Sequence, residues 1–64
     1  MKLGNKVKTR REELGLSQEE LAFKMGYKSR TSINKIENGR EVSQKIIVKL
    51  AEALHTSPAH LMGW

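Results

Sequence analysis

The segment around Ser17 constrains the fold more than any other part of this 64-residue chain. The Ser17 hydroxyl can accept a hydrogen bond from the amide of Glu20, and the Glu20 carboxylate can accept one from the amide of Ser17. This capping box marks the start of a helix. Leu16 and Leu21 flank it at the spacing of a hydrophobic staple, which fixes the angle at which the chain enters the helix. The pattern predicts a helix over residues 18–25.

Glycine, serine and proline mark four further helices. The first covers residues 3–14 and ends at Gly15. Ser29 is predicted to cap a helix over residues 30–38, which Gly39 ends. The remaining starts are Ser43 for the fourth helix and Ser57-Pro58 for the fifth. Because no segment alternates as a strand would, we expect one all-α domain of five helices.

The apolar face of the first helix has one position filled by a base. Its members at helical spacing are Leu3, Val7 and Leu14, with Arg10 or Arg11 at the missing place.

The charge is unevenly distributed. Residues 1–11 carry five bases and no acid, residues 12–23 carry four acids and no base, and residues 24–40 carry five bases and one acid, within a net charge of +5. Two basic zones around an acidic one fit nucleic acid, a membrane surface or an acidic partner. With no cysteine in the chain, a disulfide or thiolate zinc site is excluded. No apolar run is long enough for a membrane span, and the first residues lack a signal-peptide pattern.

The predicted third helix has a narrow apolar half and a broad polar half. Ile33 and Ile36 can anchor it to a core, together with Ser32 and Glu37 on the same side. Arginine and lysine pair with guanine edges, asparagine with adenine, and threonine can offer a methyl group to thymine. The outer half could be an ordinary solvated face or a surface for a DNA groove, and it consists of Arg30, Thr31, Asn34, Lys35 and Asn38.

A short capped helix, a tight turn containing glycine and a second helix with a basic outer face form a helix-turn-helix arrangement. The sequence predicts that the helices over residues 18–25 and 30–38 make this motif. The second of them would then enter the major groove of duplex DNA.

The residues also match a known family. The segments Leu14-Gly15-Leu16-Ser17-Gln18-Glu19-Glu20-Leu21-Ala22 and Ser32-Ile33-Asn34-Lys35-Ile36-Glu37-Asn38-Gly39 resemble the Cro-like (XRE) helix-turn-helix domains of phage repressors. The likeness continues through Leu50-Ala51-Glu52-Ala53-Leu54 and the last eight residues. It implies a five-helix, lambda-repressor-like bundle that binds DNA.

The resemblance implies a role for each matching residue. The residues that match base-contacting positions are Arg30, Thr31 and Lys35. Asn34 lies on the same face and could contact a base or a phosphate. A partly buried ion pair that links the first helix to the end of the third is implied between Arg11 and Glu37, with Arg10 competing with Arg11 for either the pair or a phosphate. The other expected phosphate contacts are Gln18, Lys28, Ser29, Asn38, Gly39 and Arg40.

One departure from the family pattern affects the turn. The separation between Gly26 and Ile33 is seven residues where the family commonly has six. Either the turn is longer or the third helix starts earlier by a partial turn. The extra residue therefore affects the expected roles of Lys28, Ser29, Arg30 and Thr31 by about one position and leaves those of Lys35 and Asn38 unchanged.

No cofactor, metal or small-molecule substrate is expected. His55 and His60 lie across a helix break without a further ligand, and no nucleophile has a base and an orienting partner, so the chain is not expected to be an enzyme. Met62 and Trp64 are candidates for core packing or for a dimer contact.

We therefore expect a transcriptional regulator, of the phage or prophage repressor type, that works in the cytoplasm as a homodimer on a two-fold operator in double-stranded DNA. The alternative is a protein-interaction module of the antitoxin or anti-regulator type on the same fold. Residues 1–64 would form a single domain, either a complete protein or the N-terminal part of a longer repressor.

Overall fold

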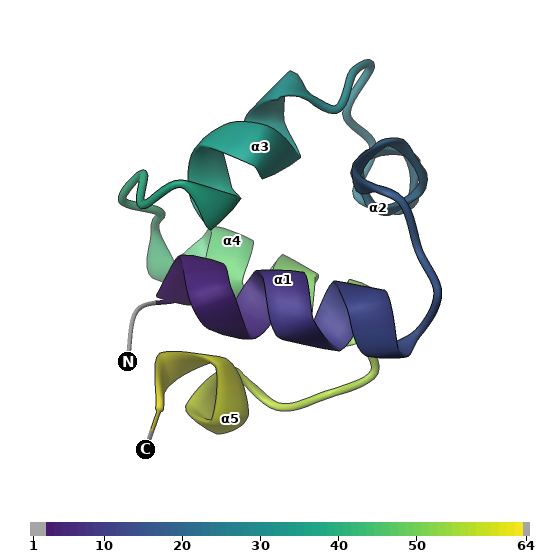
Figure 1. The fold of residues 1–64 in the computed structure, drawn as a ribbon. Helices are drawn as coiled ribbons and strands as arrows, with labels where there is room; N and C mark the ends of the chain where they lie inside the picture. The colour runs from purple at the N-terminus through teal and green to yellow at the C-terminus, as the bar shows by residue number, and fades with distance from the viewer. Residues whose placement is uncertain (1–2, 64) are drawn as a thin grey trace.

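The computed structural model describes residues 3–63, and these form five helices. Helix α1 lies across the middle of the molecule, with α3 on one side and α5 on the other (Figure 1). Helix α2 packs against α3, and α4 packs against α5. The predicted all-α, five-helix architecture is confirmed, and its elements are α1 (Leu3–Glu13), α2 (Gln18–Lys24), α3 (Thr31–Glu37), α4 (Gln44–Ala53) and α5 (Pro58–Met62).

All five helices supply the same small core. Each of them contributes an aliphatic side chain with no exposed surface, namely Val7, Leu21, Ile33, Leu50 and Leu61. A chain of this size has few such residues, so each one holds a large share of the buried apolar area. The core therefore fixes the relative orientation of α2 and α3 through Leu21 and Ile33.

The predicted helix starts at Ser17, Ser43 and Ser57 are confirmed. The capping box has both of its bonds, from the Glu20 amide to the Ser17 hydroxyl at 3.0 Å and from the Ser17 amide to the Glu20 carboxylate at 2.9 Å. These bonds to the ionised form hold the pKa of Glu20 below its ordinary value of 4.5, the backbone bond from Ser17 having the largest effect.

The predicted start of α3 is wrong by one residue. Ser29 was expected to be the N-cap, but Arg30 occupies that position, with helical backbone angles and no side-chain bond. The Ser29 hydroxyl accepts a bond from the amide of Thr31, two residues on, at 3.4 Å. Because this local bond holds Ser29 inside the turn, the extra residue after Gly26 lengthens the turn and α3 begins at Thr31.

Four helices end with the same pair of hydrogen bonds. After α3, the Gly39 amide donates to the Ile36 carbonyl and the Arg40 amide donates to the Lys35 carbonyl, which is the Schellman arrangement. The residue after the cap has a positive φ in each case, and it is glycine after α1, α2 and α3. After α4 it is His55, with φ of 54°, the only non-glycine residue with positive φ among residues 3–63.

Helix α1 approaches the end of α3 more closely than a side chain would allow. A Cβ atom built on Gly4 would lie 2.6 Å from the carbonyl oxygen of Glu37 and 2.7 Å from that of Ile36. Both are backbone atoms, so neither can rotate away. Glycine at position 4 therefore sets the distance between α1 and the C-terminal end of α3.

Candidate nucleic-acid interface

Helix α3 is anchored by one narrow side and exposes the other. Ile33 and Ile36 are buried, with exposed fractions of 0% and 3%. The residues predicted to touch bases are all exposed, as is the next residue at helical spacing on that side. Two of these residues carry positive charge and none carries negative charge, and the exposed set is Arg30, Thr31, Asn34, Lys35 and Asn38.

An ion pair beneath this surface ties α1 to α3 and to the segment that precedes α2. The Arg11 Nε donates to Glu37 Oε2 at 2.6 Å and its Nη2 donates to Oε1 at 3.2 Å. The Arg11 side chain is 10% exposed and that of Glu37 is 4% exposed. A third bond runs from Arg11 Nη1 to the Leu16 carbonyl at 2.7 Å. The ion pair was predicted between these two residues, and it is Arg11, rather than Arg10, that fills the gap in the apolar face of α1.

The hydrogen bond to Glu37 is the main reason that the pKa of Arg11 is raised above its ordinary value. Arginine is already protonated at every physiological pH, so the Arg11 guanidinium keeps its positive charge beside Glu37 throughout that range. Glu37 is thus a neutralised anchor for α3 and adds no repulsion toward a phosphate.

Gln18 joins the same network from the start of α2. Its Nε2 donates to Glu37 Oε1 at 3.1 Å. The amide nitrogen has two hydrogens, so one N–H remains for an outside acceptor. Gln18 and Arg30 line one hollow together with Ser17 and Glu19. The fold therefore brings a predicted phosphate contact next to a predicted base contact.

Arg10, predicted at a DNA phosphate, is used elsewhere. Its Nε donates to the Leu54 carbonyl at 2.9 Å, and its Nη2 donates to the His55 carbonyl at 3.2 Å. The remaining Nη1 faces Glu13 at 3.3 Å. Because all three nitrogens are bonded within the protein, the structure gives Arg10 the role of tying α1 to the end of α4 instead.

Gly39 also differs from its prediction. Its amide donates to the Ile36 carbonyl at 3.1 Å, so its one N–H is not available to a phosphate. Glycine is needed here because φ is +103°, a conformation that other residues rarely adopt. Gly39 thus acts by ending α3, which leaves the following Arg40 guanidinium as the exposed donor group at this end.

Asn38 was likewise expected to hold a phosphate, and it is instead paired with Asn34. The Asn38 Nδ2 donates to the Asn34 backbone carbonyl at 2.8 Å and also to the Asn34 side-chain Oδ1. Both of its N–H groups are therefore in use. The sequence did not predict this pair, although two asparagines four residues apart on a helix are adjacent side chains.

The other predicted phosphate contacts lie at the two ends of α3. Lys28 and Ser29 are exposed in the turn before the helix, and Arg40 is exposed after it. With Gln18 they form a discontinuous set around the exposed side of α3. Groups placed in this way can contact the phosphates of a DNA duplex on both sides of a helix that faces the bases.

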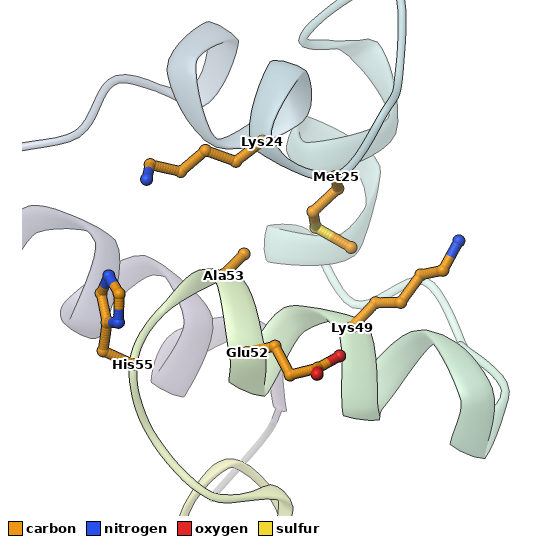
Figure 2. Close-up of a pocket in the computed structure, with 6 residues that line it drawn as sticks. All are labelled: Lys24, Met25, Lys49, Glu52, Ala53 and His55. Carbon is orange, nitrogen blue, oxygen red and sulfur yellow. The ribbon is translucent and has the colours of Figure 1, made fainter.

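A second hollow lies between the ends of α2 and α4, and it lacks converging polar groups. Met25 and Ala53 face its centre, whereas Lys24 and Lys49 extend in opposite directions (Figure 2). Within residues 3–63, no three histidine, cysteine or acidic side chains come together as a metal site. No helix in the same stretch is long and apolar enough to cross a membrane.

Met62 is half-buried and lines a shallow groove with Leu3, Val42 and Ile47. The structure thus gives it partial core packing and leaves part of it at the surface. Trp64, the other residue predicted at a dimer contact, lies outside the described residues.

The two packed helices α2 and α3, with a tight turn between them and a polar outer face on the second, define a helix-turn-helix protein. The helix-turn-helix family matches residues 7–61, and the chain belongs to this family of DNA-binding transcriptional regulators, of the XRE type, which are not enzymes.

Two solved structures are similar over nearly their whole length. One is the restriction-modification controller protein C.AhdI from Aeromonas hydrophila, with 42% identity, a TM-score of 0.85, and coverage of 92% of this chain and 89% of that one. The other is the P22 c2 repressor in complex with a synthetic operator, with 27% identity, a TM-score of 0.85, and coverage of 95% and 92%. The lambda-repressor-like fold predicted from the sequence is thereby confirmed.

Proposed function

We propose that this chain regulates transcription by binding a specific site in duplex DNA with α3 in the major groove. The observation that carries the proposal is the exposed face of α3, which is polar, cationic and held in place by the buried Arg11–Glu37 pair. Thr31, Asn34 and Lys35 would meet the bases along the helix. Arg30 would do so from the N-cap position.

The phosphate contacts in this proposal are fewer than those expected from the sequence. The exposed or partly exposed donor groups at the edges of the α3 face belong to Gln18, Lys28, Ser29 and the Arg40 side chain. Such contacts fix the position of the protein on the duplex without reading its sequence.

The size of the domain supports binding as a homodimer. Its longest dimension is 29 Å. Half-sites in dimeric helix-turn-helix complexes lie about 34 Å apart, one turn of DNA. Two copies related by a two-fold axis would therefore occupy a palindromic site, and Met62 lies on a partly apolar surface that a second copy could cover.

The regulatory role that we propose is that of a controller protein. The chain shares more of its sequence with the restriction-modification controller than with the P22 repressor, at equal structural similarity. The phage-type repressor expected from the sequence is the second candidate, and the similarity to P22 c2 favours it. In either role the protein would act in the cytoplasm, where bacterial or phage DNA is transcribed.

In vitro selection from random duplexes tests the binding function. We expect a palindromic motif, and we expect Lys35→Ala to weaken binding to that motif by about 1–3 kcal/mol while relaxing the preference at one base pair. Lys28→Ala should weaken binding to all duplexes alike and lower the salt slope by about one. Lys49→Ala, an exposed lysine on α4 outside the α3 face, is the matched control and should change neither the base preference nor the salt slope.

Two results would contradict the proposal. Equal losses on selected and random duplexes for Lys35→Ala would exclude base reading by α3. Absence of salt-dependent binding to any duplex at about 50 mM salt would favour the protein-interaction alternative. A transcription reporter that carries the selected site upstream of its promoter then separates activation from repression.

A further inference from the structure

The pair formed by Asn34 and Asn38 restricts how Asn34 can contact a base. Asn34 lies on the exposed side of α3, and Asn38 lies one turn further along the same side. The Asn38 Nδ2 donates to both the backbone carbonyl and the side-chain Oδ1 of Asn34. The two carboxamides are therefore held together at the surface proposed to meet DNA.

Chemistry fixes the orientation of both carboxamides. The backbone carbonyl of Asn34 is only an acceptor, so the group of Asn38 that faces it, at 2.8 Å, must be the NH2. The same NH2 faces the Asn34 side chain, and there only the oxygen can accept. The oxygen of the Asn34 carboxamide thus points toward Asn38, and its own NH2 points away from Asn38.

The orientation matters because an asparagine usually reads adenine with both ends of its carboxamide. Its NH2 donates to N7 and its oxygen accepts from the N6 amino group. Here the oxygen of Asn34 already accepts a hydrogen bond from Asn38, and the NH2 of Asn34 is the group that points away from Asn38. Guanine presents two acceptors, N7 and O6, on its major-groove edge, and these match the two N–H groups of one NH2.

We propose that Asn38 is a positioning residue that makes Asn34 a hydrogen-bond donor toward DNA, so that Asn34 selects guanine over adenine. The proposal rests on the DNA-binding function proposed above. Asn38 itself touches no base in this scheme and acts only through Asn34.

Competition binding with selected duplexes tests the proposal on the full chain. Asn34→Ala first identifies the base pair that Asn34 reads, as the one position whose preference is lost. At that position the wild-type protein should prefer guanine to adenine by about tenfold, the discrimination of one good bidentate contact. Asn38→Ala frees the Asn34 carboxamide to rotate, and the guanine and adenine duplexes should then bind nearly equally.

A second variant separates the effect on Asn34 from any change in how α3 ends, because Asn38 is the C-cap residue of that helix. Asn38→Asp keeps the side-chain shape but offers only acceptors, so it should turn the Asn34 oxygen outward and shift the preference from guanine toward adenine. Its negative charge should also weaken all duplexes alike. Arg40→Ala is the matched control, because loss of a phosphate contact should lower affinity without changing the preferred base.

Three results would overturn this proposal while leaving the DNA-binding function intact. They are a wild-type preference for adenine at the position read by Asn34, an unchanged guanine preference in both Asn38 variants, and no position that responds to Asn34→Ala. Failure of the wild-type protein to select any duplex would instead overturn the proposed function itself, which separates the two failures.

Discussion

Replacing Arg11 by methionine removes one partner of the buried ion pair and leaves the other in place. The Glu37 side chain is only 4% exposed, so water cannot replace the lost guanidinium. The Gln18 amide, at 3.1 Å, would be the one remaining side-chain donor in the network. Arg11→Met is therefore expected to leave a carboxylate that is buried and poorly compensated.

The expected loss is large for a chain of this size. Breaking a buried ion pair by removing one partner costs about 3–5 kcal/mol. A 64-residue domain at about 0.05–0.15 kcal/mol per residue has only about 3–10 kcal/mol of stability in total. At about 4–8 °C per kcal/mol, Tm should fall by at least about 12 °C.

The double variant supplies the internal control. Arg11→Met combined with Glu37→Met replaces the pair with apolar side chains, and such replacements are often neutral or stabilising. Urea denaturation followed by far-UV circular dichroism of the wild type, both single variants and the double variant completes a double-mutant cycle. We expect the double variant to be more stable than either single variant. If its loss equals the sum of the two single losses, the pair is not coupled and the reasoning fails.

Three further predictions concern stability. Gly4→Ala should lower the free energy of unfolding by about 1–2 kcal/mol, because overpacking against the α3 backbone outweighs the helix propensity gained. The control Asn5→Ala, at an exposed position of the same helix, should raise it by about 0.5 kcal/mol. If urea denaturation shows that Gly4→Ala is stabilising, α1 does not approach the α3 backbone as closely as described. His55→Gly should raise the free energy of unfolding by about 1 kcal/mol by relieving the positive φ, and a decrease measured in the same way would refute this. Glu20 has a lowered pKa in the folded state, so its contribution to stability is fully present above pH 4.5 and is lost as the pH falls through the lowered pKa. Glu20→Gln should therefore be less stable than the wild type at neutral pH and equally stable in acid. A constant difference in the free energy of unfolding across a pH series would contradict the role of the Glu20 carboxylate in the capping box.

The helix starts and stops were predictable because their causes are local. The Ser17 capping box, the starts at Ser43 and Ser57 and the ends at Gly15 and Gly39 each depend on residues within one helical turn. The start of α3 was misplaced because Ser29 had two local partners available, and the residue pattern does not show which amide its hydroxyl meets.

The exposed side of α3 was also predictable, since helical spacing separates Ile33 and Ile36 from the polar residues. The roles of single donors were not predictable in this way. Whether an arginine or an asparagine has a free N–H depends on which acceptors lie beside it, either across the fold or one turn away on the same helix. Arg10 is satisfied by the end of α4, and Asn38 is satisfied by the preceding turn of its own helix.

By itself, the sequence determined the class of fold, the order of the helices and the polar side that α3 exposes, because spacing and capping act over a few residues. The identity of Arg11 as the partner of Glu37 followed from the family resemblance, and the structure added that the pair is buried and shared with Gln18. Only the tertiary structure decided which polar groups remain free for a partner. An N–H that already donates within the protein is no longer free for a partner, and for Arg10 the contact between α1 and the end of α4 decides this.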